Sequence, residues 1–175
     1  MTPSDAAHLA RRFFGALNPR PPRPADEQWA CDRLNDGEQA LWRQMSNPDR
    51  RHAIEVARAV EAELGTATDP AVGTAALMHD VGKVRSDLGT FARVGATVFW
   101  EVVDHRRADG WLEHANPVLR RLAEYHRHPR IGGDLLAAAG SNPLTVAWAT
   151  EHHQPVERWT VPKDIGRVLK ACDDD

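Results

Sequence analysis

The sequence predicts an all-α fold, a bundle of helices, on two grounds. Alternating stretches of β-branched residues, the usual signal for strands, are almost absent, while apolar residues recur at helical spacings along the chain. Four helix starts are also marked by a capping side chain directly before a proline, the residue that suits the first helical position. These four starts are Asn47-Pro48, Asp69-Pro70, Asn116-Pro117 and Asn142-Pro143.

The N-terminal part of the chain is predicted to hold three short helices and one connector. A helix over residues 3–17 is followed by the Pro-Arg stretch of residues 18–24. This stretch is predicted to be an extended connector, because proline lacks a backbone N–H and disrupts a helix interior. Helices over residues 26–34 and 37–45 follow.

The longest predicted helix covers residues 49–64 and ends before Gly65. Pro162 with Asp164 marks a further, weaker helix start near the C-terminus. The remaining helices are predicted over residues 70–79, 91–104, 117–125, 129–139, 143–152 and 162–172.

Length and composition restrict the class of protein. A chain of 175 residues has about the size of one domain. We expect residues 1–35 to form a helical arm that packs on the main domain, residues 36–175, because so short a segment cannot enclose its own core. The net charge of −3 does not indicate a nucleic-acid binder. Two cysteines make no disulfide framework, and no apolar run is long enough to span a bilayer, so a cytoplasmic protein with reduced thiols is expected.

The most informative segment is residues 75–83, Ala-Ala-Leu-Met-His-Asp-Val-Gly-Lys. Here His79 and Asp80 stand side by side at the end of an apolar run. Neighbouring side chains on a helix point about 100° apart, so both can reach one ion only at a helix end or a distortion. Gly82 is predicted to stop the helix in a left-handed conformation, which glycine adopts without steric penalty. Lys83 adds a positive charge that suits a phosphate.

Other imidazoles and carboxylates also stand at or near the ends of predicted apolar helices. Helix ends can converge in a bundle, where metal sites are built from facing helices. Mixed nitrogen and oxygen ligands fit Mn, Fe, Ni, Co or Zn, and the pattern does not choose among them. The residues concerned are His52, His79, Asp80, His128, His152, His153 and Asp173.

The order His52, His79-Asp80, Asp173 resembles the HD superfamily of metal-dependent phosphohydrolases, and the resemblance covers most of the chain. Residues 79–83 are similar to the central motif of that superfamily, and the last helix is similar to its closing helix, where the final aspartate binds metal. The resemblance implies an all-α, HD-domain helical bundle. It also implies one metal ion held by His52, His79, Asp80 and Asp173.

Three further histidines resemble ligands of the two-metal members, which include the HD-GYP cyclic-dinucleotide phosphodiesterases. The resemblance implies that Asp80 bridges two ions, that His128 and His152 hold the second, and that His153 is either a ligand or a substrate contact. After the histidine pair the chain continues Gln-Pro-Val-Glu, residues 154–157, without a Gly-Tyr-Pro element. The resemblance therefore does not extend to cyclic di-GMP specificity.

The function that this resemblance implies is hydrolysis of a small-molecule phosphate mono- or diester, a nucleotide above all, by a metal-bound hydroxide. A phosphodiesterase is favoured slightly over a nucleotidase. Asp80, Lys83 and His153 are the expected catalytic residues, and Lys83, Arg93 and Arg130 are candidates for binding phosphate. Two alternatives stay open. One is a di-iron oxygenase that uses the same ligands, and the other is a metal-binding nucleotide sensor without turnover.

Overall fold

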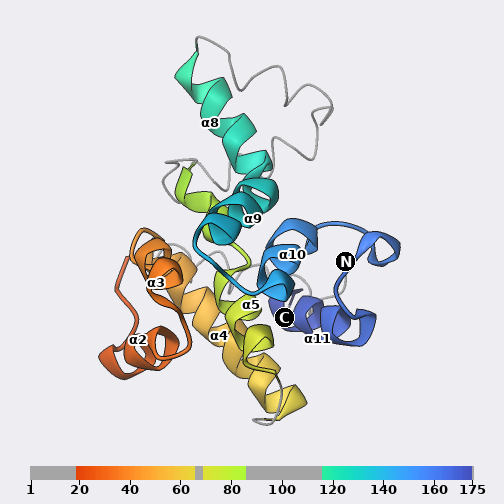
Figure 1. Ribbon diagram of the computed structural model, residues 1–175. Coiled ribbons are helices and arrows are strands. Elements are labelled where there is room, and N and C mark those ends of the chain that lie inside the picture. Colours follow the sequence, from red (N-terminus) through yellow and green to blue (C-terminus); the bar gives the residue numbers. More distant parts are fainter. Residues whose placement is uncertain (1–18, 66–68, 86–115, 175) are drawn as a thin grey trace, which may run out of the picture.

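The computed structural model describes residues 19–65, 69–85 and 116–174. Over these ranges the fold is all-α, as predicted, with no strand (Figure 1). The predicted helices over residues 3–17 and 91–104 lie outside the described residues. Two short 3₁₀ helices are present, η1 (Val81–Arg85) and η3 (Val156–Arg158). The α-helices are α2 (Pro24–Cys31), α3 (Asp36–Trp42), α4 (Asn47–Leu64), α5 (Pro70–Met78), α8 (Pro117–His126), α9 (His128–Ala138), α10 (Pro143–Glu151) and α11 (Lys163–Asp174).

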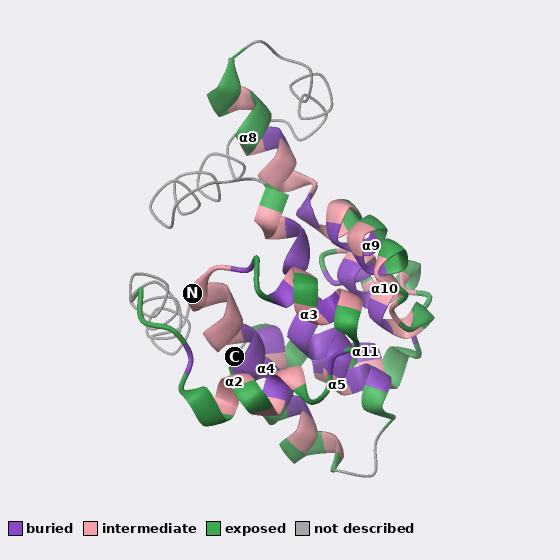
Figure 2. Ribbon diagram, turned by 60° about the vertical axis from the view of Figure 1, so that its left-hand side comes forward, coloured by how far each residue is buried: buried purple, intermediate pink, exposed green. Residues whose placement is uncertain are grey.

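Helix α5 forms the centre of the described fold. Nearly all its residues are buried, and an α-helix that is apolar on every side belongs in a protein interior. It packs against α4 and α10, and Figure 2 shows the buried residues gathered around it. Helix α4 is amphipathic instead. Its residues Ala53, Val56, Ala57 and Val60 recur at helical spacing and face the core.

The other helices surround this central pair. Helices α2 and α3 lie on one side of α4, helices α10 and α11 lie on the other, and α8 projects away from the rest (Figure 1). Helix α9 packs against α10 and against η1. Ala30 and Leu34, which fall in the predicted N-terminal arm, belong to the same hydrophobic cluster as Trp42 and Leu77.

Three of the four predicted helix starts are confirmed. The side chains of Asp69, Asn116 and Asn142 each accept a hydrogen bond of 2.9 Å from the backbone N–H two residues further on. Each cap is followed by proline at the start of the helix. These bonds satisfy N–H groups that have no partner inside the helix.

The fourth start is wrong by one residue. The N-cap of α4 is Ser46, whose side chain accepts from the Asp49 N–H at 3.3 Å, and Asn47 already belongs to the helix. The Asn47 amide donates instead to the Pro19 carbonyl at 2.8 Å. The predicted connector over residues 18–24 is also one residue too long. Pro24 is the first residue of α2, a position where a missing N–H costs nothing.

The predicted role of Gly82 is wrong as well. Among the described glycines, positive φ occurs at Gly65 (79°), which ends α4 as predicted, and at Gly140 (72°). Gly82 lies inside η1, a helix that the sequence pattern did not predict. A Cβ atom at Gly82 would stand 1.9 Å from the His128 carbonyl oxygen, so glycine is required for close approach of η1 to α9.

None of the described helices combines the length and the apolar character that crossing a membrane requires.

Candidate metal centre

The centre is built where α5 ends. His79 is the C-cap of α5, and the chain then tightens into η1, with a hydrogen bond of 3.0 Å from the Lys83 N–H to the Asp80 carbonyl. This change from α to 3₁₀ geometry lets the side chains of the neighbours His79 and Asp80 point toward the same site. It is the helix end that the sequence predicts for two adjacent ligands. Both are buried, with 1% and 6% of their surface exposed.

The first group of ligands joins α4, the end of α5 and α11. The Asp173 Oδ1 atom lies 3.0 Å from His52 Nε2 and 3.4 Å from His79 Nε2. His79 Nε2 is also 3.4 Å from Asp80 Oδ2. Donor atoms of His52, His79 and Asp80 lie within 4.8 Å of one another, a spacing at which they could hold one ion. The structure therefore brings together all four residues predicted for the first metal.

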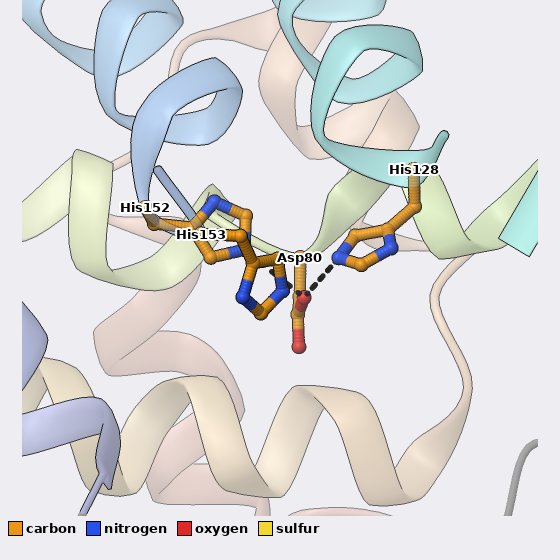
Figure 3. Close-up of side chains that lie close together, drawn as sticks. All are labelled: Asp80, His128, His152 and His153. Atoms are coloured by element: carbon orange, nitrogen blue, oxygen red, sulfur yellow. Dashed lines mark ion pairs between the residues drawn. The ribbon is translucent and has the colours of Figure 1, made fainter. Parts of the chain in front are cut away.

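The second group joins Asp80 to α9 and to the end of α10. Donor atoms of Asp80, His128, His152 and His153 also lie within 4.8 Å of one another. Figure 3 shows Asp80 with His128 on one side and the pair His152 and His153 on the other. The His153 ring lies 4.1 Å from the His152 ring and 5.1 Å from the His128 ring, between centroids, and His153 is the exposed member of the group.

Asp80 is shared between the two groups, with one oxygen directed to each. Its Oδ2 atom faces His79, while its Oδ1 atom lies 3.3 Å from His128 Nε2 and 3.7 Å from His152 Nε2. A carboxylate with its two oxygens turned to separate sets of imidazoles has the arrangement of a bridging ligand.

The three buried imidazoles are oriented by backbone carbonyls. The Nδ1 atoms of His79, His128 and His152 lie 2.8, 2.7 and 3.0 Å from the carbonyl oxygens three residues earlier, those of Ala76, Tyr125 and Ala149. These carbonyls are in the last turns of α5, α8 and α10, where carbonyls lack helical partners. Because the carbonyl can only accept, Nδ1 carries the proton and Nε2 is directed into the site.

The Nε2 atoms of these three imidazoles are buried and make no hydrogen bond within the described structure. A buried polar atom without a partner is costly, and a metal ion would remove that cost. The donor set of imidazole nitrogens and carboxylate oxygens fits Mn, Fe, Co, Ni or Zn. The residues present therefore fit a metal centre.

The electrostatics favour charged carboxylates and a neutral His128. Burial raises the pKa of Asp80, but the charges of Lys83 and His79 outweigh burial and hold that pKa well below its usual range. Burial likewise raises the pKa of Asp173, yet the hydrogen bond with His52 and the neighbouring His79 imidazole bring it below its usual range. Burial lowers the pKa of His128, so its ring is neutral at pH 7 and can bind a metal.

His79 and Lys83 are held in their charged forms in the metal-free protein. Burial alone would lower the pKa of His79, but the Asp80 and Asp173 carboxylates raise it to about 10. Lys83 Nζ contacts Asp80 Oδ2. Burial would lower the pKa of Lys83 too, but Asp80, with smaller effects of Tyr125 and Asp49, raises it above its usual value.

The remaining candidates for binding phosphate are not placed at the centre. Arg93 lies outside the described residues. Arg130 is exposed on the first turn of α9, and no hydrogen bond or ion pair joins it to the described site residues. The sequence reasoning missed Tyr125, whose carbonyl orients His128 and whose ring lies 5.7 Å from the His128 ring. Its position three residues before a histidine at a helix junction was the available signal.

Comparison with known proteins gave no relative: no protein-family model matches the chain, and neither a curated protein nor a solved structure does. The conclusions about function consequently depend on the site itself.

Proposed function

We propose that this protein is a metal-dependent phosphohydrolase that cleaves a phosphate mono- or diester, with a nucleotide as the preferred class of substrate. Two divalent ions would be held, one by His52, His79, Asp80 and Asp173, the other by Asp80, His128, His152 and His153. The observation that carries the proposal is the position of Asp80, whose two oxygens face two separate groups of imidazoles. The order of these residues along the chain, similar to that of the HD superfamily, supports it.

When bound, two such ions lower the pKa of water to give a nucleophile near neutral pH and neutralise charge on phosphoryl oxygens. The residues of the chain would then divide the remaining tasks. Asp80 holds the two ligand groups together, and the carbonyls behind His79, His128 and His152 fix the imidazoles before any ion arrives.

Lys83 and His153 would act on the substrate. Lys83 lies beside Asp80 and its pKa is raised, so it offers a positive charge to a phosphoryl oxygen at neutral pH. His153 is exposed while its two imidazole neighbours are buried, so it is the member of the second group that a substrate reaches first. No serine or cysteine nucleophile is needed in this scheme.

Metal analysis followed by turnover with bis-p-nitrophenyl phosphate and a panel of nucleotides, with Mn²⁺ added, tests the proposal. The expected result is two ions per chain and release of nitrophenol or phosphate. Asp80→Asn should abolish activity and reduce the metal content, because it replaces a shared carboxylate by a weak ligand. Asp134→Asn, at an exposed carboxylate on α9, is the matched control and should leave both unchanged.

His128→Ala separates the two groups. It should remove one ion and leave the fold and the other ion in place, since His128 belongs to the second group alone. Unchanged stoichiometry would exclude His128 from the centre. Two bound ions without hydrolysis would contradict the phosphohydrolase. In that case oxygen consumption by the iron-loaded protein would support an oxygenase, and nucleotide binding without turnover would support a sensor.

A further inference from the structure

The loop that follows α10 is closed on itself by a buried carboxylate that the proposed reaction does not use. Glu151, the last residue of α10, has 8% of its surface exposed. Its Oε2 atom accepts from the Thr160 backbone N–H at 2.7 Å, and its Oε1 atom accepts from the Thr160 hydroxyl at 2.6 Å. Burying a carboxylate is costly unless it is hydrogen-bonded, and Thr160 supplies both bonds.

Trp159 strengthens this closure. Its Nε1 atom donates to the carbonyls of Glu151 at 3.1 Å and Gln154 at 2.9 Å. Its ring meets the Trp148 ring edge-on, with centroids 5.3 Å apart. The other contact is with α11, where a Cβ on Gly166 would stand 2.7 Å from Trp159 Cε3. The end of the loop is therefore fixed to both α10 and α11.

His152 and His153 are the first two residues of this closed loop. His152 is held from the helix side, because its Nδ1 atom also approaches the Trp148 carbonyl, at 3.2 Å. His153 has no hydrogen bond in the described part of the chain, and its place depends on the course of the loop. The Gln154 N–H, next to it, donates to the Glu151 carbonyl at 2.7 Å.

We propose that Glu151 and Thr160 are positioning residues for the second metal ion, a role that rests on the proposed metal centre. The hydrogen bonds between them, here called the Glu151–Thr160 clamp, hold the loop in the course that places His153 beside His128. Groups that orient metal ligands without touching the ion commonly change metal affinity by about 10–100-fold when they are removed. For a clamp that acts through the loop backbone, we expect the lower end of that range, about tenfold.

The test is Zn²⁺ affinity of the full chain, measured by competition with a chromophoric chelator, which gives a dissociation constant for each ion. Thr160→Val keeps the shape of the side chain and the backbone bond but removes the hydroxyl bond. It should weaken the affinity for the second ion about tenfold and leave the affinity for the first ion unchanged. Glu151→Gln should act in the same direction. Thr160 offers two donors to residue 151, and the NH2 end of a glutamine amide cannot accept from either of them. Thr160→Ser keeps the hydroxyl and should bind both ions as the wild type does.

Thr145→Val is the matched control. It also removes a buried hydroxyl bond from α10, the one of 3.3 Å to the Ala71 carbonyl, but at the end of the helix away from the histidine pair. It should lower stability without changing either affinity. In the His128→Ala background, where the second ion is already lost, Thr160→Val should have no further effect on the remaining ion.

The outcomes separate the two levels of inference. Wild-type protein that binds no metal would contradict the metal centre. Wild-type protein with two ions and a Thr160→Val variant with both affinities unchanged would contradict the clamp alone. If Thr160→Val weakened the affinity for both ions equally, or if Thr145→Val weakened the affinity for the second ion as much, the clamp would contribute only to overall stability. Either result would overturn the positioning role. Thr160 is exposed, so this variant decides the matter even if Glu151→Gln fails to fold.

Discussion

Gly82 permits a close approach of η1 to the backbone of α9, and its replacement by alanine should separate the two halves of the second metal group. A Cβ at this position would stand 1.9 Å from the His128 carbonyl oxygen and 2.7 Å from the Gly132 nitrogen. Both atoms are backbone of the first two turns of α9, so neither can rotate away. Reaching even 3.0 Å requires η1 and α9 to separate by about 1.1 Å.

The size of the effect follows from that displacement. Overpacking a well-packed interior costs about 1–3 kcal/mol, and a clash with backbone belongs at the upper end, about 3 kcal/mol. For a chain of this size the corresponding fall in melting temperature is about 6–12 °C. Asp80 Oδ1 lies only 3.3 Å from His128 Nε2, across the same contact, so the separation should also weaken the second metal ion.

Two other glycines make a graded control series. At Gly73, inside α5, an added Cβ meets nothing within 4 Å, so Gly73→Ala should raise stability by about 0.5–1 kcal/mol through helix propensity. Gly132→Ala, with its Cβ 3.1 Å from the Gly82 nitrogen, should fall between the two. Urea denaturation of the metal-free proteins measures the order. A Gly82→Ala variant as stable as the wild type would refute the close-approach argument. A destabilised Gly82→Ala variant that kept both metal affinities would refute the claim that the separation of η1 and α9 weakens the second metal ion.

Three further predictions concern pH, metal and capping. Despite burial, the pKa of His79 is raised from 6.5 to about 10 by the Asp80 and Asp173 carboxylates. The charged imidazole should therefore stabilise the fold fully below pH 6.5, and this stabilisation should be lost as pH rises through 10. The free energy of unfolding of the chelator-treated protein should fall over that interval, and His79→Asn should flatten the profile. Zn²⁺ binding at pH 8 should release the His79 proton, which calorimetry in buffers of different ionisation enthalpy detects. Asn35→Ala removes the capping box of α3 and should cost about 1 kcal/mol in urea unfolding.

Local signals predicted most of the described helices, because their starts depend on residues that are close in sequence. The capping residues Asp69, Asn116 and Asn142 satisfy N–H groups two positions away, and no tertiary contact is needed to recognise them. The failures have the opposite origin. Helix η1 and the role of Gly82 depend on the approach of α9, whose first turn is far away in the sequence. A local pattern cannot contain that contact.

The candidate site was predictable in its members but not in its geometry. The sequence placed His52, His79, Asp80, His128 and Asp173 in one set through motif order, and the structure brings their donor atoms together. The division of the two Asp80 oxygens between the groups depends on the joint packing of four helix ends. The Glu151–Thr160 clamp was missed because a Glu and a Thr nine positions apart give no motif.

His79 is held by a helix-end carbonyl as His128 and His152 are, but the two ligand groups differ in how far their other members depend on distant contacts before an ion binds. His128 and His152 are each held by a carbonyl at the end of the preceding or their own helix, bonds that form as soon as those helices end. His52 lies within α4, and its hydrogen-bond partner is Asp173 on α11, far away in the sequence. The first group is thus complete only when α11 has docked on α4. Because Asp80 belongs to both groups, the preformed imidazoles of the second group and the docking of the last helix are coupled through a single carboxylate.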